Sequence, residues 1–385
     1  MRLPSTRRAL RVVLLAIGAA ALAGCSLFSS PDPRFEPAPL TQYTAGVALR
    51  QIWSVSLGSG SGYGFVPVVV GDSVYAAAPS GKVSKIDLAT GHVQWQASTK
   101  KTLTAGVGSD GTITAVAEID GSVVAFNDQG HEAWHAQASS EVNIPPTVGD
   151  GVVVVRGSDY RIQAFDETTG KPLWNVQRPG PALALKTNMQ MILVQGMLIS
   201  GLPNGRLIAI NAHTGSVQWE GPVSISRGAT DLERISDVVG TPQIQGPALC
   251  GVTYQGHVSC FDVSQGGRPM WSKAFSSTTG MASDAQQVYL SNQSGVVYAF
   301  DLSDGHQAWK QSALRNRRLS EPAVVRQGVA VGDLAGYVHI LSRTDGHLLG
   351  RIQVGSDPIV SPLVATTHGL LVQSGSGNLV LVGVN

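Results

Sequence analysis

The sequence has little charge, few cysteines and none of the common catalytic patterns. Of its 385 residues 14% are charged, the formal net charge is +1, and cysteine occurs 3 times. A nearly neutral chain has no strong attraction for nucleic acid, so we expect no nucleic-acid partner. The chain also lacks Gly-x-Ser-x-Gly, His-Glu-x-x-His and phosphate-loop patterns. These absences argue against a hydrolase, a zinc protease or a nucleotide-binding enzyme.

Apolar runs that bear on membrane attachment are confined to the N-terminus. Val12–Ala23 is apolar, follows an arginine-rich segment, and is too short to span a bilayer comfortably. The residues at its end and directly after it, Leu22-Ala23-Gly24-Cys25, resemble the signal of bacterial lipoproteins. An ordinary secretory signal with an incidental cysteine is the alternative. The resemblance implies that residues 1–24 are a signal peptide and that Cys25 carries the lipid.

The residues after Cys25 bear on location. Ser26 stands where an aspartate retains many lipoproteins at the inner membrane, so the resemblance implies the periplasmic face of the outer membrane. The segment that follows, as far as residue 45, is rich in proline and serine and has no hydrophobic period. We therefore expect residues 25–45 to be a lipid anchor and flexible tether.

One motif recurs along the rest of the chain with a period of about 40 residues, which is typical of repeat architectures. In Gly295–Trp309 (GVVYAFDLSDGHQAW) it predicts an alternating strand, a tight turn closed by glycine, and a second strand that contains tryptophan. Similar segments are Gly81–Trp95, Gly121–Trp134, Tyr160–Trp174, Gly205–Trp219, Gly256–Trp271 and Gly336–Gly350, the last without tryptophan. The repeat therefore predicts an all-β fold.

The two ends of the chain complement each other. The last repeat starts at Gly377 and ends before its turn, whereas Arg50–Trp53 is a tryptophan strand with no partner before it. Joining these two halves completes an eighth unit and hides the edge of the sheet. We predict an eight-bladed β-propeller over residues 46–385, with an N-terminal strand closing the last blade.

All seven tryptophans occupy one position of the repeat. Each could bury about 150–250 Å² between neighbouring blades, so we expect a structural role rather than a ring of ligand-stacking aromatics. They are Trp53, Trp95, Trp134, Trp174, Trp219, Trp271 and Trp309.

Cys250 and Cys260 lie on the two strands of one predicted hairpin. With a three-residue loop they are directly opposite and can form a disulfide, whereas with a two-residue loop they point to opposite faces. A buried pair of free thiols is the alternative.

Two consecutive spacers between repeats are longer than the others. They follow Trp174 and Trp219, so we expect two insertions that project from adjacent blades and form a docking site. The second insertion is rich in mixed charge, with Arg227, Asp231, Glu233, Arg234 and Asp237. A basic loop, Arg315–Arg318, is interpreted as a solvated rim, with a partner contact as the alternative.

The repeat itself resembles that of quinoprotein alcohol dehydrogenases, in the pattern Ala-[Phe/Ile]-Asp-x-x-Thr-Gly-x-x-x-Trp. Those enzymes stack a quinone on a disulfide between adjacent cysteines, and this chain has no Cys-Cys pair. We therefore expect no catalysis and no bound cofactor or metal.

Two local motifs resemble the BamB family, the propeller lipoproteins of the outer-membrane β-barrel assembly machinery. One is Leu183-Ala184-Leu185-Lys186, and the other runs from Arg234 to Pro242 and includes Asp237. The resemblance implies a non-catalytic scaffold that binds the periplasmic POTRA domains of BamA through Leu183, Leu185, Lys186, Arg234 and Asp237. It makes unfolded outer-membrane proteins a further candidate partner. A cell-envelope propeller with another partner is the alternative.

The sequence departs from the family at two positions. Lys186 replaces an arginine, which keeps the charge but loses the planar guanidinium, and Val239 stands where a second aspartate is frequent. Because Leu183 and Leu185 are two residues apart, we expect them to face one side of an extended segment. They could also begin an ordinary buried strand. We expect Asp237 to supply the charged part of the same surface.

Overall fold

The computed structural model describes residues 32–385 except 59, 61, 182 and 227. The chain divides into two compact units, Met1–Ala38 and Pro39–Asn385. The described part of the first unit holds a single turn of 3-10 helix, η1 (Pro33–Phe35), whose N-cap is Asp32. The expectations for the signal peptide and for Cys25 lie outside the described residues. No helix within the described range is long and apolar enough to cross a membrane.

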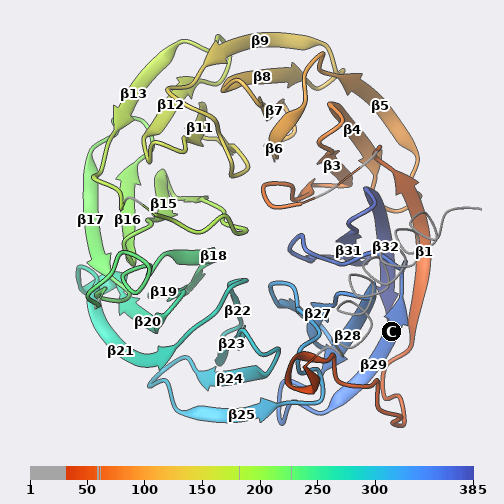
Figure 1. Cartoon of the computed structure of the whole chain (residues 1–385). Coiled ribbons are helices and arrows are strands. Elements are labelled where there is room, and N and C mark those ends of the chain that lie inside the picture. Colours follow the sequence, from red (N-terminus) through yellow and green to blue (C-terminus); the bar gives the residue numbers. More distant parts are fainter. Residues whose placement is uncertain (1–31, 59, 61, 182, 227) are drawn as a thin grey trace, which may run out of the picture. The chain divides into compact units, whose positions relative to one another are not determined.

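The second unit is a ring of eight antiparallel four-stranded sheets (Figure 1), which confirms the predicted β-propeller. Its start at Pro39 precedes the expected boundary at residue 46. Tyr43 explains the difference, because its ring lies against the guanidinium of Arg351, which also donates a hydrogen bond to the carbonyl oxygen of Thr41. The end of the expected tether is therefore part of the folded unit.

The strands of each blade run from the central channel to the rim, in chain order except in blade 8. Blade 1 is β2 (Val68–Val70), β3 (Ser73–Ala77), β4 (Lys82–Asp87) and β5 (Val93–Ser98); blade 2 is β6 (Leu103–Ser109), β7 (Ile113–Glu118), β8 (Ser122–Asn127) and β9 (Glu132–Gln137). Blade 3 is β10 (Thr147–Gly149), β11 (Val152–Arg156), β12 (Ile162–Asp166) and β13 (Pro172–Val176); blade 4 is β14 (Ile192–Val194), β15 (Met197–Gly201), β16 (Arg206–Asn211) and β17 (Val217–Pro222). Blade 5 is β18 (Val238–Gln245), β19 (Ala248–Thr253), β20 (Gly256–Asp262) and β21 (Arg268–Phe275), with the 3-10 turn η2 (Val263–Gln265) before β21. Blade 6 is β22 (Met281–Ser283), β23 (Gln287–Ser291), β24 (Val297–Asp301) and β25 (Gln307–Gln311); blade 7 is β26 (Ala323–Val325), β27 (Gly328–Gly332), β28 (Tyr337–Leu341) and β29 (Leu348–Gln353). Blade 8 is β30 (Val364–Thr366), β31 (Gly369–Gln373), β32 (Asn378–Val384) and, at the rim, β1 (Leu49–Ser56).

Ring closure joins the two ends of the second unit. β1 pairs antiparallel with β32, from Leu49 opposite Val384 to Ser56 opposite Asn378, with a bulge between Gln51 and Trp53. The predicted closing strand is confirmed. The pairing covers the edge of β32 that the chain end would otherwise leave open.

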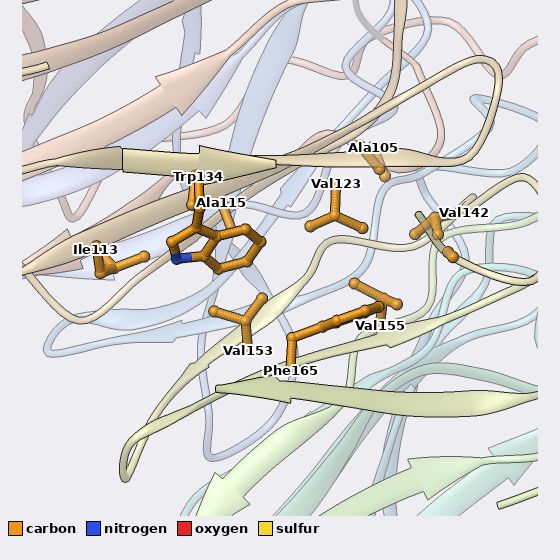
Figure 2. Packing of buried hydrophobic residues seen from close by; sticks show 12 residues of the cluster. Ala105, Ile113, Ala115, Val123, Trp134, Val142, Val153, Val155 and Phe165 are labelled. Atoms are coloured by element: carbon orange, nitrogen blue, oxygen red, sulfur yellow. The ribbon is translucent and has the colours of Figure 1, made fainter. Parts of the chain in front are cut away.

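The hydrophobic core lies between neighbouring blades. Figure 2 shows Ala115, Val123 and Trp134 of blade 2 facing Val153 and Phe165 of blade 3. All five are buried, and each large apolar side chain contributes roughly 1.5–3 kcal/mol when it is withdrawn from water. Since every sheet buries both faces, the inner strands are apolar almost without interruption.

The tryptophans join each blade to the next. Five indole N–H groups donate hydrogen bonds of 2.7 to 2.9 Å to a backbone carbonyl of the following blade, at Leu88, Glu167, Ala212, Leu302 and Arg343. The turn glycine of the following blade lies over the indole. At Gly346, with φ +75°, an added Cβ would lie 2.8 Å from Cδ2 of Trp309 and closer still to Cε3, and the same close approach recurs at the other six tryptophans. Glycine is needed both for the positive φ and for this contact.

The missing tryptophan of blade 7 has a structural explanation. The corresponding residue is Gly350, where an added Cβ would lie 2.8 Å from the carbonyl oxygen of Val47. The amides of Gly46 and Val47 both donate to the carbonyl oxygen of Leu349. The approach to the closing strand thus occupies the space of an indole, and blade 8 has no turn that would need one.

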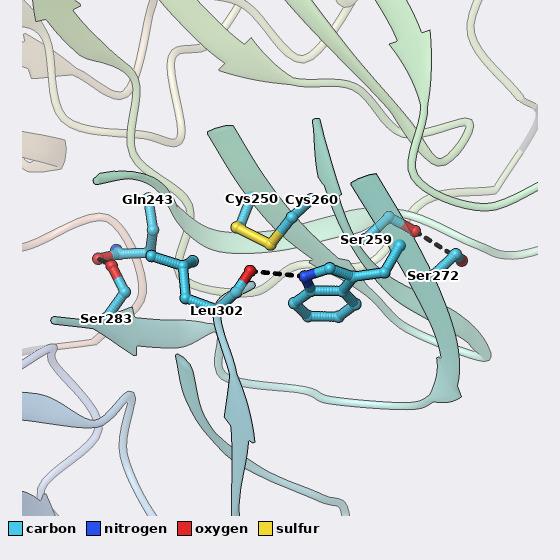
Figure 3. Close-up of a disulfide and its surroundings, with 8 residues drawn as sticks. Gln243, Cys250, Ser259, Cys260, Ser272, Ser283 and Leu302 are labelled. Atoms are coloured by element: carbon cyan, nitrogen blue, oxygen red, sulfur yellow. Dashed lines mark hydrogen bonds between the residues drawn. A yellow bond between two sulfur atoms is a disulfide. The ribbon is translucent and has the colours of Figure 1, made fainter. Parts of the chain in front are cut away.

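A disulfide joins Cys250 and Cys260, which lie opposite each other on β19 and β20 (Figure 3). Trp271 is opposite Cys260 on the neighbouring strand β21 and donates its indole N–H to the carbonyl oxygen of Leu302. The hairpin therefore has the register that a three-residue loop produces.

The basic loop Arg315–Arg318 is not wholly solvated. Arg317 is buried, and its Nε donates a 2.7 Å hydrogen bond to Oδ2 of Asp333, which also lies 2.8 Å from Nε2 of the buried His339. The interpretation of the whole loop as a solvated rim was wrong for Arg317, because its charge is matched inside blade 7. Arg315 and Arg318 are exposed.

Candidate functional site

The first insertion crosses one end of the central channel instead of projecting outward. Near its start, Oη of Tyr160 in blade 3 donates to the carbonyl oxygen of Pro181 at 3.3 Å. Further on, Oγ1 of Thr187 donates to the carbonyl oxygen of Thr278 at 2.7 Å, in the loop that enters blade 6. Nδ2 of Asn188 donates to the carbonyl oxygen of Val360, in the loop that enters blade 8. We call residues 183–190 the crossing segment.

The ring geometry explains why this segment spans the channel. Blades 4 and 8 are opposite each other in a ring of eight, so a hydrogen bond between the loops that enter them must pass the axis. The segment is also joined to blade 5, since the amide of Gly240 donates to the carbonyl oxygen of Asn188 at 2.9 Å. The expectation that both insertions project from the ring was wrong for the first one.

The two leucines of the first motif do not share a face. Leu183 is 48% exposed, whereas Leu185 is half-buried and packs against the apolar cluster between blades 5 and 6. Lys186 is exposed. The alternation expected of an extended strand fails here because Leu183 to Lys186 are not in a strand, and the hydrogen bonds of the segment go to other blades, including Gly240 of β18.

Asp237 lies beneath this segment, not beside it. Its side chain is 1% exposed, and its Oδ2 accepts a 2.5 Å hydrogen bond from the amide of Leu185. Burial raises the pKa of Asp237 to about 6, although the Leu185 amide and the positive charge of Arg156 oppose this. The expectation that Asp237 supplies an exposed charge was wrong, since a carboxylate at the start of β18 is covered by the crossing segment.

A cavity of about 220 Å³ adjoins the crossing segment where blades 3, 4 and 5 meet. Its polar lining includes Asn143, Arg156, Tyr160, Lys186 and Asp237. The Arg156 guanidinium donates to the carbonyl oxygen of Gly201, and burial lowers its pKa to about 10 while Asp237 favours its charged form. Arg156 therefore places a positive charge within the joint between the three blades.

Charged side chains of the second insertion form hydrogen bonds within the insertion itself. Nε of Arg234 donates to the carbonyl oxygen of Gly228 at 3.0 Å, and the amides of Ala229 and Thr230 donate to the carboxylate of Glu233. Arg234 remains exposed, as expected. Arg227 lies outside the described residues.

Sequence reasoning missed the apolar part of the second insertion. Ile225 is 69% exposed and Leu232 is 67% exposed, more than any large apolar side chain of the regular blades in the described part of the chain. Their signal was available, because large apolar residues between charged ones in an insertion have no blade to pack against. Two large apolar side chains exposed within one insertion make it a candidate interaction site.

Buried ionisable groups away from the insertions have internal partners. Glu321, which lines the central channel, accepts a 3.0 Å hydrogen bond from the amide of Thr241, and Asp333 pairs with Arg317 and His339. Within the described residues no three histidine, cysteine or acidic side chains are grouped so that they could hold a metal ion. Among the described residues, the two insertions differ from the regular blades in the large apolar side chains that they leave exposed, Leu183, Ile225 and Leu232.

The chain is similar to known proteins over its whole length. The family model described as outer membrane protein assembly factor BamB matches residues 79–311. The chain is 54% identical over 385 residues to outer membrane protein assembly factor BamB of Bordetella pertussis, with 100% of both chains covered. The crystal structure of BamB from Moraxella catarrhalis superposes with a TM-score of 0.81 at 25% identity, covering 87% of this chain and 100% of that one.

The likeness to quinoproteins is weaker. Quinohemoprotein alcohol dehydrogenase from Comamonas testosteroni has a TM-score of 0.67 at 15% identity, covering 87% of this chain and 76% of that one, which is a likeness of fold alone. The family model and the full-length relative agree with each other, and the chain belongs to the family of outer membrane protein assembly factor BamB.

Proposed function

We propose that this protein is a non-catalytic scaffold in the assembly of outer-membrane proteins, and that it docks its partner at the end of the propeller that carries the two insertions. The observation that supports this most directly is the hydrogen bond between the Leu185 amide and Asp237. It joins the two motifs of the family resemblance into one structural unit, although they are far apart in sequence.

The proposed partner is the set of POTRA domains of BamA. Leu183, Ile225 and Leu232 are exposed apolar side chains on the insertions, and Lys186 and Arg234 are exposed cations close to them in sequence. Apolar anchors supply most of the affinity of such interfaces, while charges mainly set orientation and association rate. Unfolded outer-membrane proteins are a second proposed partner, for which no described contact argues specifically.

The proposed location is the periplasmic face of the outer membrane, with residues 1–24 removed and Cys25 lipidated. Cys25→Ser should leave unprocessed precursor and prevent stable attachment, since several acyl chains on one residue give firm anchoring. Processing and membrane fractionation that match the unmodified protein would rule this attachment out.

Docking can be tested with purified BamA POTRA domains. Leu183→Ala and Leu232→Ala should each raise the dissociation constant about tenfold, which corresponds to a loss of about 1.4 kcal/mol at an apolar anchor. Leu173→Ala is the matched control, because Leu173 is 47% exposed, like Leu183, but lies at the start of β13, at the end of the propeller opposite the insertions. Binding of both insertion variants within about twofold of the wild type would contradict the proposed docking site.

Two other functions are distinguished by direct measurement. A quinoprotein would reduce dye only when the quinone is added, and the absence of adjacent cysteines in the sequence argues against it. A propeller with a different partner would bring that protein down in place of BamA when the full-length protein is purified from membranes.

A further inference from the structure

We infer that Asp237 is a positioning residue for the docking surface: its buried carboxylate holds the crossing segment by the Leu185 amide, so that Leu183 and Lys186 face outward. The consequence for binding rests on the proposed function. The structural consequence, a tethered crossing segment, does not.

Burial excludes a direct contact between Asp237 and a partner. The side chain is 1% exposed in the free chain, and a partner that approached it would first meet the residues of the crossing segment. Its Oδ2 is already bonded to the Leu185 amide at 2.5 Å. A carboxylate in this position can influence binding only through the segment that covers it.

The hydrogen bond lies within the crossing segment. The flanking contacts are at Pro181, which accepts from Tyr160, and at Thr187, which donates to the loop that enters blade 6. Between these two points Leu185 is held by Asp237, and its side chain packs between blades 5 and 6. Loss of the carboxylate would free the backbone beside Leu183 and Lys186 while the ends of the segment stay attached.

The charges around Asp237 favour this role. Arg156 of blade 3 lies near enough to support the carboxylate electrostatically, while its own guanidinium donates to the carbonyl oxygen of Gly201 in blade 4. Tyr160 and Lys186 line the same cavity. Asp237 thus connects the start of blade 5 to the crossing segment. Arg156 of blade 3, which lies beside it, connects to blade 4 through Gly201.

Substitution can separate the hydrogen bond from the charge. Asparagine has nearly the same shape as aspartate, so the variant Asp237→Asn keeps an oxygen that can accept from the Leu185 amide but removes the negative charge. Asp237→Ala removes both. A positioning role predicts that asparagine rescues what alanine loses, whereas a role of the charge itself at the partner predicts that both substitutions are equally harmful.

The experiment measures two quantities on the full-length protein and its variants. The first is amide hydrogen exchange in peptides that cover residues 183–190, and the second is the dissociation constant for BamA POTRA domains. Asp237→Ala should accelerate exchange at Leu185 and weaken binding, each by about tenfold or more, since a hydrogen bond to a charged group is lost. Asp237→Asn should leave both within about threefold of the wild type. Leu183→Ala should weaken binding without changing exchange.

The outcomes distinguish this inference from the proposed function. Asp237→Asn that binds as poorly as Asp237→Ala, with wild-type exchange at Leu185, would overturn the positioning role. Unchanged exchange in Asp237→Ala would overturn it as well. If Asp237→Ala fails to fold, Asp237→Ser serves in its place, because its shorter side chain also loses the bond. If the wild type does not bind POTRA domains at all, the proposed partner is wrong, and the exchange measurements still decide whether Asp237 holds the segment.

Discussion

The contact between each tryptophan and the next turn glycine makes a quantitative prediction at Trp309 and Gly346. Trp309 is 6% exposed and donates a 2.7 Å hydrogen bond to the carbonyl oxygen of Arg343. Trp309→Ala should therefore cost roughly 3–5 kcal/mol through the cavity it leaves, with about 1 kcal/mol more for the unpaired carbonyl.

Gly346→Ala should depend on whether the tryptophan is present. At φ +75° an alanine costs roughly 1–2 kcal/mol of backbone strain in any background. In the wild type its Cβ would also lie 2.8 Å from Cδ2 of Trp309 and overlap Cε3, and overpacking of that kind costs about 1–3 kcal/mol. In the Trp309→Ala background the second cost disappears. The two substitutions should therefore show a coupling energy of about 1–3 kcal/mol.

Urea unfolding of the compact unit Pro39–Asn385, followed by circular dichroism, measures the four members of this cycle. Gly196 provides the matched control, because its φ is +74° and no atom lies within 4 Å of an added Cβ. Gly196→Ala should cost only the strain, by the same amount in both backgrounds. If Gly346→Ala costs the same with and without Trp309, to within about 0.5 kcal/mol, the packing argument is refuted.

Three further predictions concern closure, pH and the disulfide. Deletion of residues 46–56 removes β1 and exposes the edge of β32, so the protein should aggregate or melt at a much lower temperature, and an unchanged cooperative transition would contradict the closure argument. Burial raises the pKa of Glu321 from its ordinary value of 4.5 to about 8. The stabilising effect of the protonated carboxyl is therefore fully present below the unfolded pKa, decreases above it, and is lost once the pH has risen through 8. Between these two pH values the free energy of unfolding of the wild type should fall by on the order of 3–5 kcal/mol relative to Glu321→Gln, and parallel pH profiles would disprove this. Reduction of the Cys250–Cys260 bond should lower the free energy of unfolding by roughly 2–3 kcal/mol, an effect of reductant that should be absent in Cys250→Ala.

The parts of the structure that sequence could predict are those that repeat. The spacing of the motif located the strands, and the incomplete copies at Arg50–Trp53 and Gly377 predicted closure, because the repeat shows which strand each incomplete blade lacks even when that strand comes from the other end of the chain. The register of Cys250 and Cys260 was limited to two possibilities because they lie on the two strands of one hairpin. The pattern is sufficient wherever the contacts follow the repeat.

The candidate site depends on contacts that do not follow the sequence repeat. The Leu185 amide meets Asp237 across a separation of 52 residues, and Asn188 meets Val360 across 172. Both contacts exist only because the ring brings the loops that enter different blades to one end of the channel. Alternation in sequence therefore misplaced Leu185 beside Leu183, and charge in sequence misplaced Asp237 at the surface.

The way in which the repeat is broken supports the proposal that docking occurs at the insertions. A ring of similar blades presents nearly the same surface many times, so one partner can be held in one orientation only where that similarity ends. The repeat is interrupted where blades 7 and 8 meet, because Val47 and Gly350 pack against each other there and Val47 is buried. The repeat is also interrupted by the insertions before blades 4 and 5, where Leu183, Ile225 and Leu232 are exposed. The first break is satisfied within the chain. The second leaves apolar surface that a partner can cover, and the part of it at Leu183 lies beside the Leu185 amide, from which the buried carboxylate of Asp237 accepts a hydrogen bond.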